Sequence, residues 1–214
     1  MMKIPTCYSI ALAALVAGGT AFAADLGESP LPTPRMTGGM PLLQSLKERQ
    51  SRREFKPEAL SARQLSDLLW AAFGINRPDN DHRTAPSAQN TQDIDVYVAT
   101  AEGLYVYEAK PHGLRKVSDQ DLRPLTTGQE SVKVAPVQLV YVSDFDRMAK
   151  VTPEMRELYA GVDAGAVMQN VYLFCASEGL ATVVHELDRQ PLARAMGLRP
   201  GQRIVLAQAV GWPK

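Results

Sequence analysis

A short cationic segment, Arg49-Gln50-Ser51-Arg52-Arg53, is the part of the chain whose residue types could best bind an anion. Arginine presents planar pairs of N–H donors that match phosphate oxygens, and serine adds a short neutral donor. The segment falls where a predicted helix gives way to another conformation, so its donors are gathered at one turn. The pattern indicates a phosphate-binding group, although on spacing alone a solvated basic turn is the simpler interpretation.

Two further segments stand out at places where predicted elements join. Residues 83–92 form a polar stretch that leads into a predicted strand, and taken alone they predict a turn followed by a helix start. Residues 178–186 run from a long predicted helix into another strand, and taken alone they predict a helix C-cap and a crossover. Neither segment specifies a reaction by itself.

Several common catalytic and cofactor motifs are missing from the sequence. It has no G-x-G-x-x-G of a Rossmann dinucleotide site, no G-x-x-x-x-G-K of a P-loop and no G-x-S-x-G nucleophile elbow. His82, His112 and His185 lack metal-ligand spacing, and Cys175 lies in an apolar run typical of an inert core thiol. We therefore predict no metal site.

The hydrophobic pattern predicts the elements that must position these segments. One amphipathic helix begins at Pro41, and a second begins at a Ser61/Gln64 capping box and ends near Gly74. The longest predicted helix spans 153–178, and its second half is apolar on nearly all sides, so the core or a second subunit must cover it. Strands are predicted at 94–98, 104–107, 137–142, 182–184 and 203–210, with a last helix at 190–196. This order predicts an α+β fold with a mixed central sheet flanked by helices.

Composition limits the class of protein. The 214 residues carry 23 Lys+Arg and 23 Asp+Glu, and 45% of them are hydrophobic. This length and apolar content suit one domain with a real core, and they exclude a disordered chain. Zero net charge argues against a general nucleic-acid binder, which needs a basic face to displace counterions from phosphate.

The N-terminal segment has the features of an export signal. Lys3 precedes a largely apolar stretch, and Ala21-Phe22-Ala23 has the small-x-small pattern of a signal-peptidase site. The apolar run is interrupted and too short for a stable membrane anchor. We predict a signal peptide at 1–23, cleaved near the last of these alanines, and a periplasmic or secreted protein. A Pro/Gly-rich linker or extended arm follows at 24–40, and one domain at 41–214.

Taken together, in this order and spacing, the segments resemble the FMN-dependent nitroreductase family from about Pro41 to Pro213. The family motif Arg-x-Ser-x-Arg-x-Phe is met by Arg49, Ser51, Arg53 and Phe55. Further similar stretches are 68–77, the Pro-Ser-x-x-Asn loop within 83–92, 133–137, Gly179-Leu180 and 210–213. Two features, Gly103-Leu104-Tyr105 and Asp121-Leu122-Arg123, bring the chain nearer to the SagB-type dehydrogenase branch.

This resemblance implies a nitroreductase-like homodimer in which the long helices pack together and FMN is held between the subunits. Arg49 and Ser51 would hold the FMN phosphate, and Arg53 would reach the phosphate or the pyrimidine edge of the ring. The other implied cofactor contacts are Gln50, Pro86, Ser87 and Asn90, together with the backbone of His185-Glu186-Leu187 near flavin N5 and O4.

The implied activity is a two-step hydride or electron transfer from a small-molecule donor, through bound flavin, to a small organic acceptor of nitro or quinone type. The flavin performs the transfer, so no side-chain acid or base is required. Two alternatives remain open. One is a SagB-like dehydrogenase acting on a peptide or small metabolite, and the other is a non-catalytic flavin-binding module.

Three features depart from the family pattern. Gln92-Asp93-Ile94 stands where the family usually has Gln-Pro-Trp, so the wall beside the ring is expected to differ. The chain stops at Lys214 without the basic tail of many members, so either phosphate affinity is lower or Lys214 serves alone. NAD(P)H is scarce outside the cytoplasm, so an exported member would need another donor.

Overall fold

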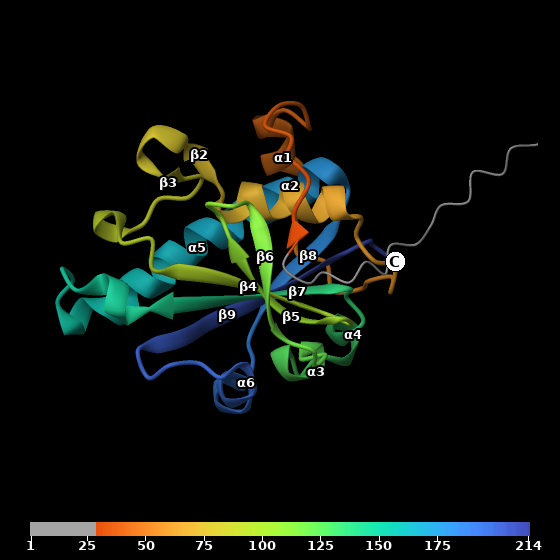
Figure 1. Cartoon of the computed structure of the whole chain (residues 1–214). Coiled ribbons are helices and arrows are strands. Elements are labelled where there is room, and N and C mark those ends of the chain that lie inside the picture. Colours follow the sequence, from red (N-terminus) through yellow and green to blue (C-terminus); the bar gives the residue numbers. More distant parts are fainter. Residues whose placement is uncertain (1–28) are drawn as a thin grey trace, which may run out of the picture.

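A seven-stranded sheet separates two layers of helices in the computed structural model, which describes residues 29–214 (Figure 1). The helices α2 (Ala62–Phe73) and α5 (Pro153–Glu178) cover one face of the sheet. The opposite face is covered by α6 (Arg189–Met196) and the short α3 (Arg123–Thr126). This arrangement confirms the predicted α+β class with a central sheet flanked by helices.

The strands of the sheet all pair in antiparallel fashion. In spatial order they are β1 (Ser29–Pro30), β6 (Gly113–Ser118), β5 (Gly103–Glu108), β4 (Ile94–Thr100), β7 (Val137–Asp144), β9 (Gln202–Gly211) and β8 (Ala181–His185). The prediction of a mixed sheet was wrong on this point. The helix α5 does connect two strands of the same direction, β7 and β8, but β9 lies between them and is antiparallel to both.

The long helices begin and end where the sequence predicts. Ser61 forms the predicted capping box, because its hydroxyl accepts from the Gln64 amide at 3.2 Å and Gln64 Oε1 accepts from the Ser61 amide at 3.0 Å. The 26-residue α5 starts at Pro153, a residue that lacks the N–H an N-terminal turn cannot pair. It stops at Gly179, whose φ of 70° favours glycine.

Each face of the sheet has its own core. The α2/α5 face buries Leu68, Leu69, Val98, Tyr141 and Val167, among others. The α6 face buries Val140, Leu104, Leu192 and Met196 with their neighbours. Successive residues of β4 and β7 point to opposite faces, so these two central strands are buried on both sides. The predicted single domain is therefore built on two hydrophobic layers that share one sheet.

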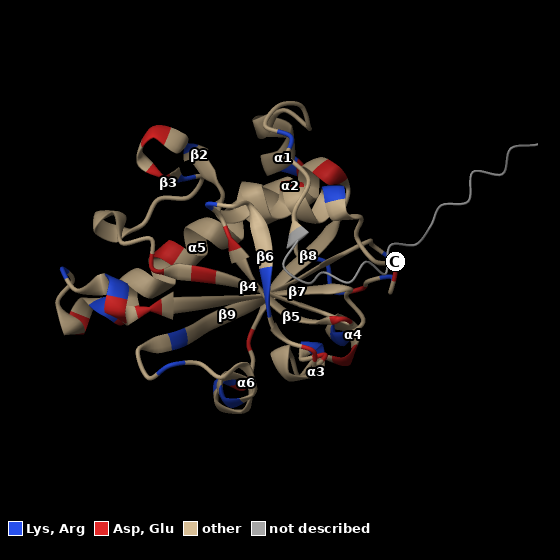
Figure 2. Cartoon of the chain, viewed as in Figure 1, with Lys and Arg blue, Asp and Glu red and all other residues tan. Residues whose placement is uncertain are grey.

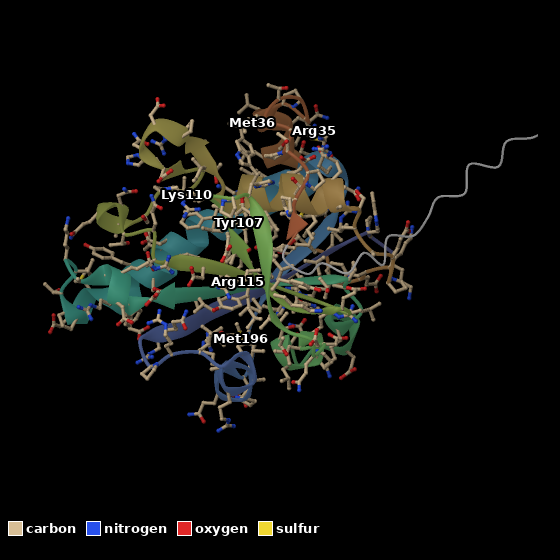
Figure 3. All side chains as sticks on the ribbon, in the orientation of Figure 1. Arg35, Met36, Tyr107, Lys110, Arg115 and Met196 are labelled. Carbon is tan, nitrogen blue, oxygen red and sulfur yellow. The ribbon has the colours of Figure 1, made fainter. Side chains whose placement is uncertain are left out.

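The segment 24–40, for which the sequence predicted a linker or an extended arm, is an ordered arm over residues 29–40. Its β1 strand extends the sheet, and Leu31 is buried in the α2/α5 core. Arg35 pairs with Asp67 at 2.6 Å and with Glu178 at 2.9 Å, which ties the arm to α2 and α5. Figure 3 shows Arg35 and Met36 beside α1. The arm has few large apolar residues, but it is also held in place by the hydrogen bonds and ion pairs that Arg35 makes with Asp67 and Glu178.

Several short elements complete the described chain. They are α1 (Leu42–Glu48), α4 (Glu130–Lys133), the hairpin β2 (Ile75–Arg77) with β3 (His82–Arg83), and the 3₁₀ turns η1 (Pro78–Asn80), η2 (Ala88–Asn90) and η3 (Phe145–Met148). None of the helices within residues 29–214 is long and apolar enough to cross a membrane. The predicted signal peptide at 1–23 lies outside the described residues.

Candidate functional site

The cationic segment follows α1 and runs beside the N-terminal part of β8. The Arg52 amide donates to the Thr182 carbonyl at 3.0 Å, which fixes the backbone of the segment to the sheet. Phe55 is buried against the sheet, whereas the side chains of Ser51, Arg52 and Arg53 are exposed. One buried anchor and one backbone bond therefore hold a turn whose polar side chains all remain open to a ligand.

Tyr172, on α5, joins the cationic segment to β8. Its hydroxyl oxygen accepts from the Val184 amide at 3.0 Å and lies 2.9 Å from the hydroxyl oxygen of Ser51. The Arg49 guanidinium carbon lies 5.3 Å from the centre of the Tyr172 ring, in a cation–π contact. The sequence analysis missed this residue. A tyrosine in an apolar helix was the available signal, because a buried phenol needs a hydrogen-bond partner.

The end of the chain lies beside the same segment. Phe55 and Pro213 form a β-bridge, and the Lys56 amide donates to the Trp212 carbonyl at 2.9 Å. The Lys214 amide donates to the Glu54 carbonyl at 3.3 Å. The backbone of Lys214 therefore lies beside Glu54, the residue after Arg53. This position suits the expectation that Lys214 adds a cation to the phosphate-binding group.

The loop that contains Pro86, Ser87 and Asn90 is strained. Three of its residues other than glycine, Gln89, Asn90 and Gln92, have φ between 47° and 54°. Such a backbone persists only where surrounding contacts fix it, and it is common at ligand-binding sites. Here Ser87 Oγ accepts from the Gln92 amide at 2.9 Å, while Pro86 and the Asn90 side chain stay exposed.

Charged groups from three sides hold this loop in place. The side-chain oxygen of Gln92 accepts from Arg83 Nε at 2.9 Å, and the backbone carbonyl of Gln92 accepts from Arg147 at 2.8 Å. The Asp163 carboxylate, on α5, accepts from the Ala88 amide at 3.0 Å through both oxygens. Contacts within the chain therefore fix the conformation of the loop without a ligand.

Two buried acids meet beneath the loop. Asp163 is 3% exposed and Asp93 is fully buried, and their side chains are hydrogen-bonded to each other. Burial, together with this bond and the charge of Asp93, raises the pKa of Asp163 to about 7. Asp93 also accepts from Ser143 Oγ at 2.6 Å and from Thr91 Oγ1 at 3.0 Å. The departure from the family's Gln-Pro-Trp pattern therefore places its acid inside the fold instead of on the wall of a cleft.

The segment His185-Glu186-Leu187 leaves the end of β8. The His185 ring is buried with its Nε2 atom 3.1 Å from Gln138 Oε1, and burial lowers its pKa. Glu186 is exposed and pairs with Arg189 at 3.0 Å, and Leu187 packs against the α6 face. The histidine and leucine side chains thus serve the core, so their backbone is the part that could meet a cofactor.

The structure brings some of the predicted residues together but leaves others apart. Arg49 and Ser51 lie at Tyr172, and β8 carries the chain from there to His185. The Pro86–Asn90 loop instead contacts α5 at Asp163, nine residues earlier, which corresponds to about 14 Å along a helix. One ligand that touched both regions would have to extend over about this distance along α5.

Several large apolar side chains of α1 and α5 are exposed. The side chains of Leu158 and Val162 on α5 are 56% and 59% exposed. On α1, Leu42, Leu43 and Leu46 form the predicted apolar face, yet Leu43 is 80% exposed. Both of these exposed residues of α5 lie in its first half, whereas in the apolar second half Val167, Val171 and Cys175 are buried in the core. Exposed apolar side chains therefore occur on both α1 and α5.

The cavities in the described chain are consistent with an incomplete cleft. One of about 140 Å³ lies beside the cationic segment and is lined by Gln50, Arg52 and Tyr172, among others. Another of about 420 Å³ lies between the arm, α2 and α5, and includes none of the predicted cofactor contacts. Within residues 29–214, His, Cys, Asp and Glu form no cluster of three or more that could hold a metal ion.

The residues at the cationic segment fit the charged end of FMN. Arg49, Arg52, Arg53 and Ser51 offer N–H and O–H donors on one exposed turn, and a phosphate monoester offers only acceptors and negative charge. In the view of Figure 2, cations and anions are otherwise interspersed over the helices and loops. The donor set therefore suits a single small phosphate ester better than an extended polyanion.

Comparison with known proteins gives a consistent result. The family model described as "Nitroreductase family" matches residues 46–212. A protein of Methanocaldococcus jannaschii named as a nitroreductase is 31% identical over 146 residues, which are 64% of this chain and 73% of the relative.

Solved structures share the fold. A crystal structure described as a nitroreductase, from Ralstonia eutropha JMP134, is 44% identical with a TM-score of 0.83, covering 86% of this chain and 88% of the other. A chain of the Escherichia coli microcin synthetase McbBCD complex, with truncated pro-MccB17 bound, is 19% identical with a TM-score of 0.68. This second alignment covers 96% of this chain and 85% of the other, and at that identity it shows the fold alone.

Proposed function

Because the chain belongs to the nitroreductase family of oxidoreductases, we propose that it is an exported, FMN-dependent member that works as a homodimer. The observation that carries this proposal is the donor cluster formed by Arg49 and Ser51 at Tyr172. The cluster lies beside β8, and its serine is exposed to solvent. A cluster of this chemistry at this place suits the phosphate of a flavin whose ring lies further along β8.

The phosphate end would be held by Arg49 and Ser51, with Gln50 beside them. Arg53 would reach the phosphate or the pyrimidine edge, where a cation stabilises the negative charge of reduced flavin. Lys214 would add a cation, since its backbone lies next to Glu54. Charge-assisted donors of this kind contribute about 1.5–3 kcal/mol each when the phosphate is bound.

The ring end would be shaped by Pro86, Ser87 and Asn90 and by the backbone of His185-Glu186-Leu187. The loop and the phosphate group would lie about 14 Å apart along α5, a distance that one flavin would have to bridge. The exposed Leu158, Val162 and α1 leucines supply apolar surface for a contact between two subunits. In this proposal the loop of one subunit completes the site of its partner.

When bound, FMN would supply the two-electron chemistry, by which a small donor is oxidised and a nitro- or quinone-like acceptor is reduced in two successive half-reactions. The chain's own part is to grip the phosphate, orient the ring and exclude water. The proposal assigns no side chain to proton transfer. Outside the cytoplasm the donor would be a reduced small molecule other than free NAD(P)H.

One experiment tests the cofactor and the chemistry separately. Protein lacking residues 1–23 should bind FMN and release it on denaturation, giving the absorption spectrum of free flavin. Stopped-flow mixing with a panel of donors should then bleach the flavin with at least one of them, and a nitroaromatic or quinone should restore the colour. Protein that does not take up added FMN would remove the proposal.

A second candidate is a SagB-like dehydrogenase acting on a peptide or small metabolite. It is favoured by Gly103-Leu104-Tyr105 and Asp121-Leu122-Arg123, and by the fold shared with a chain of the microcin synthetase complex. Flavin that is reduced by a peptide or metabolite, and not by nicotinamide or related donors, would favour this candidate. Bound flavin that no donor reduces would instead indicate a non-catalytic module.

A further inference from the structure

The hydrogen bonds around Tyr172 have a direction. Its hydroxyl oxygen already accepts from the Val184 amide at 3.0 Å. Its own proton still needs an acceptor, and within residues 29–214 the acceptor beside it is Ser51 Oγ at 2.9 Å. Either hydroxyl of the Tyr172–Ser51 pair could donate, and we assign the order Val184 amide to Tyr172 and Tyr172 to Ser51 because it gives the Tyr172 proton an acceptor within the protein.

This order leaves the Ser51 proton unused by the protein. Ser51 is exposed, so its hydroxyl can turn that proton towards a ligand. On the other side of Tyr172, the Arg49 guanidinium lies over the ring at 5.3 Å and is limited in its movement. Tyr172 therefore contacts two groups of the cationic segment, a hydroxyl that can donate to a ligand and a guanidinium that carries only donors.

We infer that Tyr172 is a positioning residue that fixes Ser51 and Arg49 as a donor-only cluster and thereby selects a phosphate ester over the corresponding alcohol. A phosphate monoester can accept charge-assisted bonds from every member of such a cluster, whereas the single 5′-hydroxyl of riboflavin is neutral and accepts more weakly. The inference rests on the proposed function, and it adds a selectivity for FMN over riboflavin to it.

The removal of one oxygen tests this role. In Tyr172→Phe the ring and the Arg49 contact remain, but Ser51 loses the donor that orients it. We expect the affinity of apoprotein for FMN to fall by about tenfold, because preorganisation of a charge-assisted donor is lost. Affinity for riboflavin should change less than about twofold. Flavin fluorescence titration with each ligand measures both constants.

Matched variants give the test its controls. Tyr159→Phe removes a hydroxyl from the same helix about three and a half turns earlier, and it should leave both affinities unchanged. Ser51→Ala, at an exposed position, should weaken FMN binding by itself. In that background Tyr172→Phe should add less than about twofold, because the two hydroxyls act as one unit.

The outcomes separate the inference from the proposed function. Equal loss of FMN and riboflavin affinity in Tyr172→Phe would show that the tyrosine supports the fold, and would overturn the inference. Unchanged FMN affinity, or fully additive effects with Ser51→Ala, would overturn it as well while the proposed function stands. Wild-type protein that binds neither flavin would overturn both.

Discussion

The cationic segment Arg49–Arg53 and the Pro86–Asn90 loop both contact α5, yet they are built in opposite ways. The first is a largely exposed turn held by the buried ring of Phe55, by backbone bonds to β8 and to the end of the chain, and by contacts with Tyr172. The second is a strained backbone whose polar groups are already bonded to Asp163, Arg83 and Arg147. A ligand can therefore form charge-assisted hydrogen bonds at the first region, whereas the second region mainly offers it a surface of fixed shape.

This difference divides the work of a binding site. Affinity for an anionic end should come from the open donors, since their hydrogen bonds are satisfied only by water or a ligand. Placement of a ring should come from the loop, since its geometry is fixed without the ligand. In the proposed homodimer, a second subunit would join the two regions into one site across the exposed face of α5.

The largest expected effect comes from separating the two regions. Leu158→Asp combined with Val162→Asp places two charges on the apolar face of α5, where burial without a partner costs several kcal/mol each. We expect the protein to sediment as a monomer and to lose FMN. Sedimentation equilibrium and flavin release after gel filtration measure both results.

The same charge at a different exposed leucine is the control. Leu125→Asp alters α3, on the opposite face of the sheet, and should leave dimer and flavin intact. A double variant that stays dimeric, or a monomeric variant that keeps FMN, would show that one chain holds the whole site and that the comparison above is wrong.

Removal of the open donors should have the next largest effect. Arg49→Ala with Ser51→Ala deletes two charge-assisted contacts of about 1.5–3 kcal/mol each, so FMN affinity should fall at least about a hundredfold. The loop should be unaffected, so the dimer should persist. Isothermal titration with FMN measures the loss, and Lys150→Ala, an exposed cation beyond β7, is the control. Unchanged affinity would refute the assignment of the phosphate group.

The buried acids make the loop respond to pH. The pKa of Asp163 is raised to about 7, whereas an aspartate in the unfolded chain titrates near 3.9. Between these values the folded protein holds more protons than the unfolded chain. Stability should therefore fall as pH rises through this window, by on the order of 2 kcal/mol, and level off above it.

Asp163→Asn is a close mimic of the protonated acid. Its carbonyl can accept from the Ala88 amide, and its NH₂ group can donate to the Asp93 carboxylate. We expect the variant to lose most of the fall in stability between pH 5 and 8 and to match or exceed wild type at pH 8, as measured by urea unfolding. A variant that keeps the wild-type slope would show that Asp163 is ionised throughout.

The sequence predicted most of the fold because its signals were local. The Ser61/Gln64 box, the Gly179 stop and the alternation of β4 and β5 depend on neighbours a few residues away. The mixed sheet was wrong because strand direction at β9 depends on which strands it pairs with, a long-range choice. The β6 strand was missed, since Arg115 and Lys116 interrupt its apolar pattern at the sheet's edge.

The site was predictable to the extent that its chemistry is visible in residue types. Arg49, Ser51 and Arg53 stand out because cations and a hydroxyl are adjacent in the chain. Tyr172 does not, because its partners Ser51 and Val184 are 121 and 12 residues away. Asp93 was read as part of a cleft wall, and only packing places it beneath the loop.

The smallest expected effect supplies a pH response of opposite sign, away from both regions. His112, in the turn before β6, lies 2.8 Å from the Tyr107 hydroxyl and 2.8 Å from Ser66 Oγ, which donates to the Pro32 carbonyl of the arm. Figure 3 shows Tyr107 near the end of β5 that leads to this turn. Burial lowers the pKa of His112, so the unfolded chain takes up a proton first as pH falls below about 6.5.

Acidification should therefore destabilise the docked arm, by less than about 1 kcal/mol because the imidazole is only half-buried. His112→Asn tolerates the local φ of 48° and should remove this contribution, leaving that of His185, whose pKa is also lowered. Urea unfolding of wild type and variant at pH 5.5 and 7.5 measures the difference. If Asp163→Asn flattens the alkaline side of the stability profile and His112→Asn flattens the acid side, the loop and the arm titrate independently. If either substitution changes both sides, the loop and the arm are coupled, and the two pH responses do not arise at separate sites.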